Sequence, residues 1–187
     1  VIAFQSNRDG HWKIWVIGAN GENPRPLSSD PFDEREPSWS PDSKSIAFTT
    51  TRTGKFDIWA RSLADGTLKQ LSFGPGGNSR ASWSPDGSQI AYLSDRRSTS
   101  GIYVSDLQGH ERQAASIKLP FGGPSIAPAG VPAWTPDGKD LLYVKFDGAQ
   151  AKYMRGDEVF LEGEDFHPFR LQWLNDREYL YTADGKI

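Results

Sequence analysis

The chain has 187 residues and a formal net charge of −3, with 21 basic and 24 acidic side chains interspersed, so no broad positive surface is expected for a nucleic acid partner. It contains no cysteine, which excludes a disulfide framework, a thiolate metal site and a cysteine nucleophile. No apolar run approaches the ~20 residues that span a bilayer, and residues 1–10 lack the features of a signal peptide, so membrane insertion is not expected.

Glycine, proline and aromatic residues are frequent along the whole chain. The 19 Gly and 13 Pro residues, together with 7 Trp, 6 Tyr and 10 Phe, are typical of short strands joined by tight turns rather than of long helices. We therefore expect an all-β fold.

The first extended segments of the chain return further along it. Residues 2–28 align with residues 46–72, so that the pair Ile14-Trp15 matches the pair Ile58-Trp59, and a third copy places Ile102-Tyr103 at the same position. Neighbouring residues of a strand point to opposite faces, so two adjacent apolar residues make sense only in a sheet that is covered on both sides. The pattern predicts stacked sheets.

A second phrase, PSWSPDSKSIAF at 37–48, recurs in close variants at 81–92 and 132–143. Its marker tryptophans are Trp39, Trp83, Trp134 and Trp173, and they are separated by 44, 51 and 39 residues. We expect each Trp to end a first strand, because the following Ser-Pro-Asp-Gly sequence suits a type I turn into a second strand. The dipeptides Asn20-Gly21 and Asp65-Gly66 are hairpin signals between a third and a fourth strand.

Four-stranded units that repeat every forty-odd residues are typical of the blades of a β-propeller. We predict an all-β propeller of four-stranded antiparallel blades in one domain, with units at 1–36, 37–80, 81–131, 132–170 and an incomplete unit at 171–187. Because propellers have ~4–8 blades and an incomplete unit leaves open strand edges, we expect these roughly four blades to be a fragment of a larger ring. The open edges also favour an edge-to-edge dimer of the fragment.

The repeated residues that look chemically active have structural explanations. A Trp that returns once per unit beside a turn is expected to pack between blades rather than to stack on a sugar or a base. The acids Asp42, Asp86, Asp137 and Asp176 occupy the turn position that favours Asp, so we interpret them as turn residues.

The sequence predicts no catalytic, metal or cofactor site. The nearest approaches to a nucleophile elbow, at 77–81 and 123–127, lack the final Gly, and the three His residues are scattered. The acidic stretch 162–167 offers oxygen ligands for a cation, but a solvated loop explains it better. The Pro- and Gly-rich stretch 119–132 fits either an ordered lid or a spacer.

The connections from a fourth strand to the next first strand should all emerge on one face, at the mouth of the central channel. Charged residues lie just before the marker tryptophans of three units. The candidate binding residues are Arg35, Glu36, Arg80, His167 and Arg170. Guanidinium groups bind carboxylates bidentately, so we expect the three Arg side chains to converge on a peptide segment or an acidic group of a partner domain.

The phrases WSPDG, IAF or IAY, SDR and IYVSDLQG resemble the repeats of TolB-like β-propellers, and the resemblance extends over essentially the whole chain. It implies a periplasmic or secreted, non-catalytic module that binds protein or peptide through its loop face. The alternative it implies is an accessory propeller of a hydrolase, an amidohydrolase or a prolyl-oligopeptidase-like peptidase, beside a separate catalytic domain. The tail at 169–187 resembles the last propeller segment of the amidohydrolase-linked group. Catalysis inside the propeller, as in pectate-degrading lyases of similar repeat type, would need a cluster of His ligands.

Overall fold

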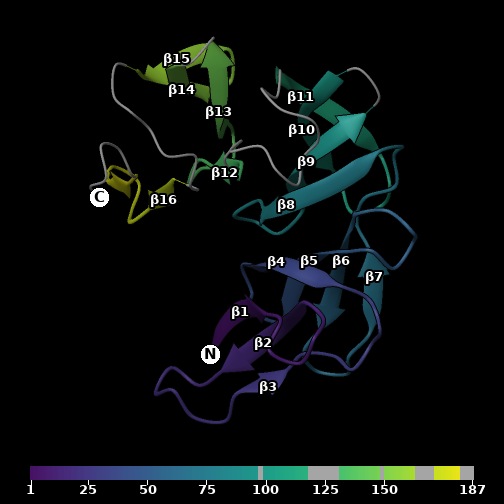
Figure 1. Ribbon diagram of the computed structural model, residues 1–187. Coiled ribbons are helices and arrows are strands. Elements are labelled where there is room, and N and C mark those ends of the chain that lie inside the picture. The colour runs from purple at the N-terminus through teal and green to yellow at the C-terminus, as the bar shows by residue number, and fades with distance from the viewer. Residues whose placement is uncertain (97–98, 118–130, 148–149, 163–170, 182–187) are drawn as a thin grey trace.

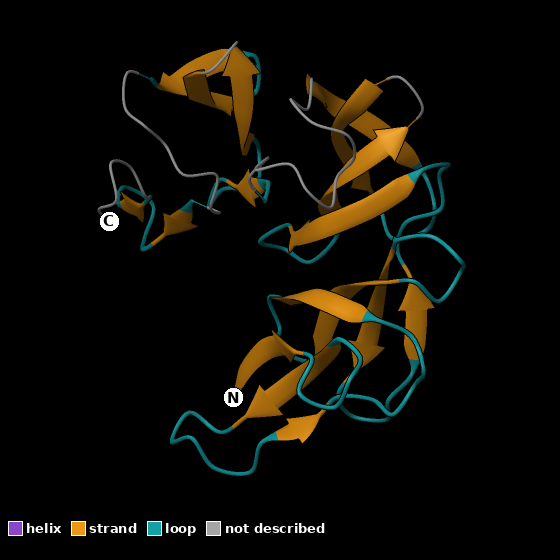
Figure 2. Cartoon of the chain, viewed as in Figure 1, coloured by secondary structure: helices purple, strands orange, loops and turns teal. Residues whose placement is uncertain are grey.

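The computed structural model describes residues 1–96, 99–117, 131–147, 150–162 and 171–181. Within these ranges the chain forms 17 strands and no helix, which confirms the expected all-β fold (Figure 2). In the same ranges, no helix is long and apolar enough to cross a membrane.

The strands form five antiparallel sheets in chain order. The first sheet contains β1 (Ile2–Ser6), β2 (Lys13–Ile17) and β3 (Arg25–Pro26), and the second contains β4 (Glu34–Trp39), β5 (Ser45–Thr50), β6 (Asp57–Ser62) and β7 (Leu68–Gln70). The third contains β8 (Gly77–Trp83), β9 (Ile90–Arg96), β10 (Thr99–Ser105) and β11 (Glu111–Ile117). The fourth contains β12 (Ala133–Trp134), β13 (Leu141–Asp147), β14 (Gln150–Arg155) and β15 (Glu158–Leu161), and the last contains β16 (Gln172–Trp173) and β17 (Tyr179–Leu180).

The sheets follow one another along an open arc, and the first strand of each lies on the inner side (Figure 1). Strand β4 contacts β8, and β8 contacts β12, so the first strands of successive sheets are neighbours around a common hub. Strand β1 takes the inner position of the first sheet and contacts β4. The four-stranded antiparallel blades predicted from the repeat are therefore confirmed.

The turns after Trp39, Trp83 and Trp134 share one repeated geometry, whereas the turn after Trp173 has different hydrogen bonds. The N–H of Gly87 donates to the carbonyl oxygen of Ser84 at 2.9 Å, and Gly138 does the same to Thr135 at 2.9 Å. The hydroxyl of Ser84 donates to Asp86 at 2.6 Å and accepts from the N–H of Gln89 at 2.9 Å. These hydrogen bonds join residues of the same turn and stabilise it, so Asp86 is a turn residue, as the sequence predicts.

The core fills the spaces between successive sheets. Ile58 and Trp59 are adjacent on β6, yet Ile58 packs with Tyr92 of the third sheet and Trp59 packs with Ile14 of the first. The second sheet is therefore covered on both faces, which explains why its third strand carries neighbouring apolar residues.

Two marker tryptophans, Trp83 and Trp134, bond one sheet to the preceding one. The indole N–H of Trp83 donates to the carbonyl oxygen of Ser38 at 3.3 Å, and that of Trp134 donates to the carbonyl oxygen of Ser82 at 3.0 Å. Each acceptor is the residue just before the marker Trp of the preceding sheet. A buried indole needs such a partner for its N–H, so these residues pack between sheets as predicted.

Candidate functional site

Three of the five candidate binding residues lie on the inner strands. Arg35 and Glu36 belong to β4, and Arg80 belongs to β8 at the position equivalent to Glu36, three residues before the marker Trp. His167 and Arg170 lie outside the described residues, as does most of the 119–132 stretch. We call the surface formed by Gln5, Arg35, Glu36 and Arg80 the hub mouth.

Both equivalent positions are backbone irregularities. Glu36 has a φ of 57° and Arg80 a φ of 58°, so two non-glycine residues adopt the left-handed conformation. Each lies in a β-bulge, because the register shifts between Arg35 and Ser38 on β4 and between Ser79 and Ser82 on β8. A bulge redirects side chains and disrupts the ladder, and left-handed non-glycine residues cluster at functional sites.

The bulges link neighbouring sheets through a chain of hydrogen bonds. The N–H of Glu36 donates to the Gln5 side chain at 2.7 Å, and the N–H of Arg80 donates to the Glu36 carboxylate at 2.9 Å. The Thr49 hydroxyl donates to the same Glu36 oxygen at 2.7 Å. The N–H groups of Glu36 and Arg80 thus each donate a hydrogen bond to a side chain of the preceding sheet. The hub mouth is therefore a preorganised surface built from three sheets.

The charges of the hub mouth are mixed rather than purely cationic. Arg80 Nε lies 3.5 Å from Glu36 Oε1, and the two side chains are 19% and 30% exposed. Arg35 instead pairs with Asp33 at 2.9 Å and lies over the Trp12 ring at 5.0 Å. The two described guanidinium groups are thus held by different acids, each with part of its surface open to solvent.

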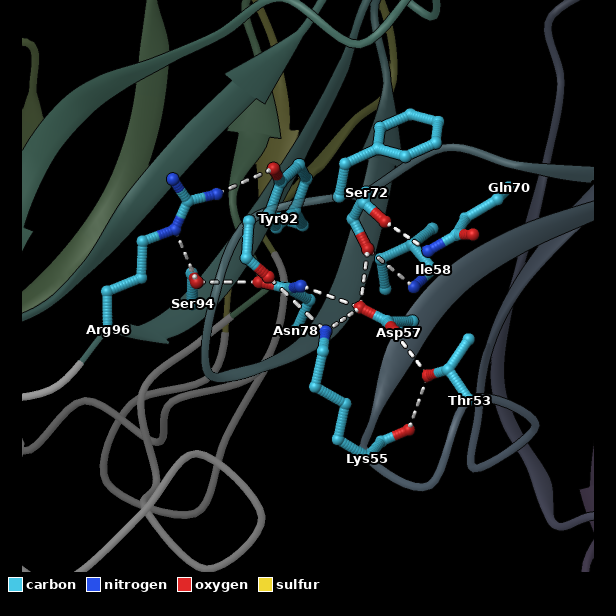
Figure 3. A network of polar contacts seen from close by, with 12 residues as sticks. Thr53, Lys55, Asp57, Ile58, Gln70, Ser72, Asn78, Tyr92, Ser94 and Arg96 are labelled. Carbon is cyan, nitrogen blue, oxygen red and sulfur yellow. Dashed lines mark hydrogen bonds and ion pairs between the residues drawn. The ribbon is translucent and has the colours of Figure 1, made fainter.

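A buried polar network around Asp57 includes Asn78 near the start of β8 (Figure 3). Asp57 is 0% exposed and accepts hydrogen bonds from Asn78 at 2.9 Å and from Ser72 at 3.3 Å, while Thr53 and Lys55 donate to it from the neighbouring loop. Asn78 lies two residues before Arg80 on β8. The network therefore fixes the start of the strand that presents Arg80.

The same network continues into the third sheet. The Ser94 hydroxyl donates to Asn78 at 2.6 Å, and Arg96 Nε donates to Ser94 at 3.2 Å (Figure 3). Arg96 pairs with Glu111. Burial raises the pKa of Glu111, but the hydrogen bonds from Tyr92, the Phe73 N–H and Arg96 outweigh it, so its pKa lies below the usual value. The negative charge on Glu111 thus holds the connection from β7 to β8 against the third sheet.

Sequence reasoning missed a second repeated side chain. Arg8, Arg52 and Arg96 occur at intervals of 44 residues, each four residues after the aromatic that ends a second-strand run. Their guanidinium carbons lie 4.3 Å, 5.5 Å and 3.8 Å from the ring centroids of Trp15, Trp59 and Tyr103, respectively. Such cation–π contacts stabilise the position of the aromatic side chain on the third strand of each unit. The regular spacing was the signal that could have identified them.

The described part of the chain contains no group of three or more His, Asp or Glu side chains placed to hold a metal ion. Of the acidic stretch 162–167, only Glu162 is described, and it pairs with Lys152 at 3.2 Å. The remainder of that stretch lies outside the described residues.

Comparison with known proteins gives matches to one family and to one fold. The family model described as TolB beta propeller domain matches residues 1–131. Comparison with curated protein sequences found no significant match.

Among solved structures, the chain is similar to the putative TolB from Agrobacterium tumefaciens, with 21% identity, a TM-score of 0.69, and 98% of this chain and 62% of that chain covered. It is also similar to TolB from Acinetobacter baumannii, with 21% identity, a TM-score of 0.68, and 83% and 38% covered. An oligogalacturonate lyase in complex with manganese gives 20% identity, a TM-score of 0.60, and 76% and 40% covered. The chain thus spans less than two thirds of the length of each of these proteins.

Proposed function

The chain belongs to the TolB beta propeller domain family, and on this basis we propose that it is a non-catalytic module that binds a protein or peptide segment at the hub mouth. The observation that carries the proposal is the pair of left-handed bulges at Glu36 and Arg80. Backbone strain at equivalent positions of two neighbouring inner strands is retained where the surrounding structure over-determines it, and this is typical of binding sites.

The chemistry of the hub mouth suits a peptide that carries a carboxylate. The guanidinium groups of Arg35 and Arg80 present planar donor forks, which bind carboxylates bidentately. Glu36 can accept hydrogen bonds from peptide N–H groups on the same surface. Arg35 is already paired with Asp33, and Arg80 with Glu36. A ligand carboxylate would therefore replace Asp33 or Glu36 as the partner of the guanidinium group.

The partner can be a separate protein or a catalytic domain adjacent to the propeller. Both would use the same face, since the connections between sheets emerge there. We further propose a periplasmic or secreted location and the five units at 1–36, 37–80, 81–131, 132–170 and 171–187 as the structural repeats, and family membership and the repeated phrases support these two points.

Selection from a phage-displayed random peptide library tests the binding proposal without knowledge of the partner. We expect the purified chain to enrich peptides with Asp, Glu or a free C-terminal carboxylate, and we expect Arg80→Ala and Arg35→Ala to reduce binding of those peptides at least tenfold. Arg112→Ala is the matched control, because Arg112 is an exposed guanidinium on the outer strand β11.

Two results would contradict the proposal. One is the absence of any enriched peptide, and the other is an enriched peptide that binds Arg35→Ala and Arg80→Ala as tightly as it binds the unchanged chain. Thermal unfolding of each variant verifies that lost binding does not reflect lost structure.

A further inference from the structure

The marker tryptophans surround a hollow at the other end of the inner strands. It has a volume of about 280 Å³, and Trp39, Trp83, Trp134 and Trp173 all line it, together with prolines of the three repeated turns. The tryptophans end the strands on which Glu36 and Arg80 lie three residues earlier, which separates the hollow from the hub mouth by about 10 Å along the strand. A ligand in the hollow would therefore not depend on the hub mouth.

The hollow opens at the junction where the repeated tryptophan bond is missing. Trp83 and Trp134 donate to the carbonyl before the preceding marker Trp, and by this rule Trp173 should donate to Ala133. Instead, Trp173 Nε1 is buried and has no hydrogen-bond partner among the described residues. Ala133 and Trp173 both line the hollow, so the junction between the fourth sheet and the last one forms part of its wall.

The lining has the composition of a cation-binding cage. Four indole rings contribute π-electron density, Asp176 contributes a carboxylate, and no Lys or Arg occurs among the described residues of the lining. Aromatic faces attract cations through their quadrupole, and rings of aromatic side chains bind quaternary ammonium groups in this way. The volume lies just below the range for drug-sized ligands, which suits a small head group.

We propose that this hollow binds an organic cation of the trimethylammonium type, with Trp39, Trp83, Trp134 and Trp173 around the cation and Asp176 as its counter-charge. Choline and tetramethylammonium both carry the cationic charge, and the neutral 3,3-dimethylbutan-1-ol has the shape of choline without its charge.

Titration of the chain, labelled with ¹⁵N at its indoles, with these three compounds at constant ionic strength tests the proposal. We expect choline and tetramethylammonium to bind, and the neutral alcohol to bind at least tenfold more weakly than choline, with the indole signals of the lining tryptophans shifting on binding. Asp176→Asn should weaken choline binding several-fold. Asp9→Asn is the matched control, because Asp9 is an exposed acid in the turn between β1 and β2 and does not line the hollow.

Equal affinity for choline and the neutral alcohol would overturn the proposal, since the hollow would then be merely apolar. Failure of choline to shift any lining indole would overturn it too. Trp173→Leu provides a second check, because it removes one of the four indoles that line the hollow. Unchanged choline affinity in that variant would assign the binding to another place.

Discussion

Ser43 occupies a turn position at which the next two units have glycine. It has a φ of 59°, whereas the equivalent residues of the next two turns are Gly87 and Gly138, with φ values of 72° and 71°. A side chain in this left-handed conformation is strained, and only glycine adopts it freely. The other residues of the turn keep the same bonds, so the strain is local.

We expect Ser43→Gly to stabilise the chain by about 0.5–1 kcal/mol, because relief of the strain exceeds the entropy that glycine gains in the unfolded chain. Urea unfolding measures the change. The reciprocal Gly87→Ser variant should lose a similar amount, and a loss of stability in Ser43→Gly would contradict the assigned turn geometry.

Asp86 makes the stability of the fold depend on pH. Hydrogen bonds from the Ser84 hydroxyl and from the N–H and hydroxyl of Ser88 lower its pKa to about 2, from an ordinary value of 3.8. A carboxyl group whose pKa is lower in the folded state stabilises that state when it is ionised, and the contribution disappears as pH falls through the folded pKa. Asp42 and Asp137 have lowered pKa values for the same reason, since Ser40 and Thr135 donate to them.

The free energy of unfolding should therefore fall as pH drops from about 4 to about 2. Urea unfolding at a series of pH values measures this, and Asp86→Asn should have a shallower dependence because one of the three repeated turns no longer titrates. An unchanged slope in that variant would show that the turn bonds do not hold the ionised form.

At the scale of strands and sheets, the turn chemistry and the repeated pairs of adjacent apolar residues were sufficient to predict the strands. Proline, Asp and Gly have intrinsic turn preferences, so the hairpins followed from local sequence. The bulges at Glu36 and Arg80 could not be predicted, because neither residue type favours the left-handed conformation. The Asp57 network had no repeat signal either, since Lys13 and Gly101 occupy the equivalent positions.

The Trp134 bond is the tighter of the two observed contacts that fasten neighbouring sheets. The side chain is 7% exposed, and its N–H lies 3.0 Å from the Ser82 carbonyl oxygen. Trp134→Phe should destabilise the chain by about 1–3 kcal/mol, because it removes this hydrogen bond between sheets and leaves a partly empty space. Chemical unfolding tests this, with Trp12→Phe in the half-buried first loop as a control that should lose clearly less.

The Asp57 network should be equally sensitive to one substitution. Asp57→Ala leaves the Asn78, Ser72 and Lys55 donors without their common acceptor, which should cost about 3 kcal/mol. The exposed Asp9→Ala is the control and should change stability by less than about 0.5 kcal/mol. Equal unfolding midpoints for the two variants would show that the network does not bind the second sheet to the third.

At the scale of the whole molecule, a repeat of short strands produces a surface that no single unit contains. Two inner strands, β4 and β8, contribute a bulge residue each, and four inner strands contribute a marker Trp each. The arc brings the equivalent residues of neighbouring units together, the bulge residues at one end of the strands and the tryptophans at the other. The sequence predicted this arrangement because a repeated unit must bury both faces of its sheet against its neighbours. The chemistry of the hub mouth was harder to predict, since the pairing of Arg80 with Glu36 depends on contact between units 44 residues apart.

The most direct test of the account is a nuclear Overhauser measurement on the indole N–H protons of Trp83 and Trp134. If successive sheets pack around a common hub, these protons must show contacts to the backbone at Ser38 and Ser82, which lie 45 and 52 residues earlier in the chain. Contacts confined to residues of their own sheet would contradict the stacking of units on which the hub mouth and the tryptophan-lined hollow depend.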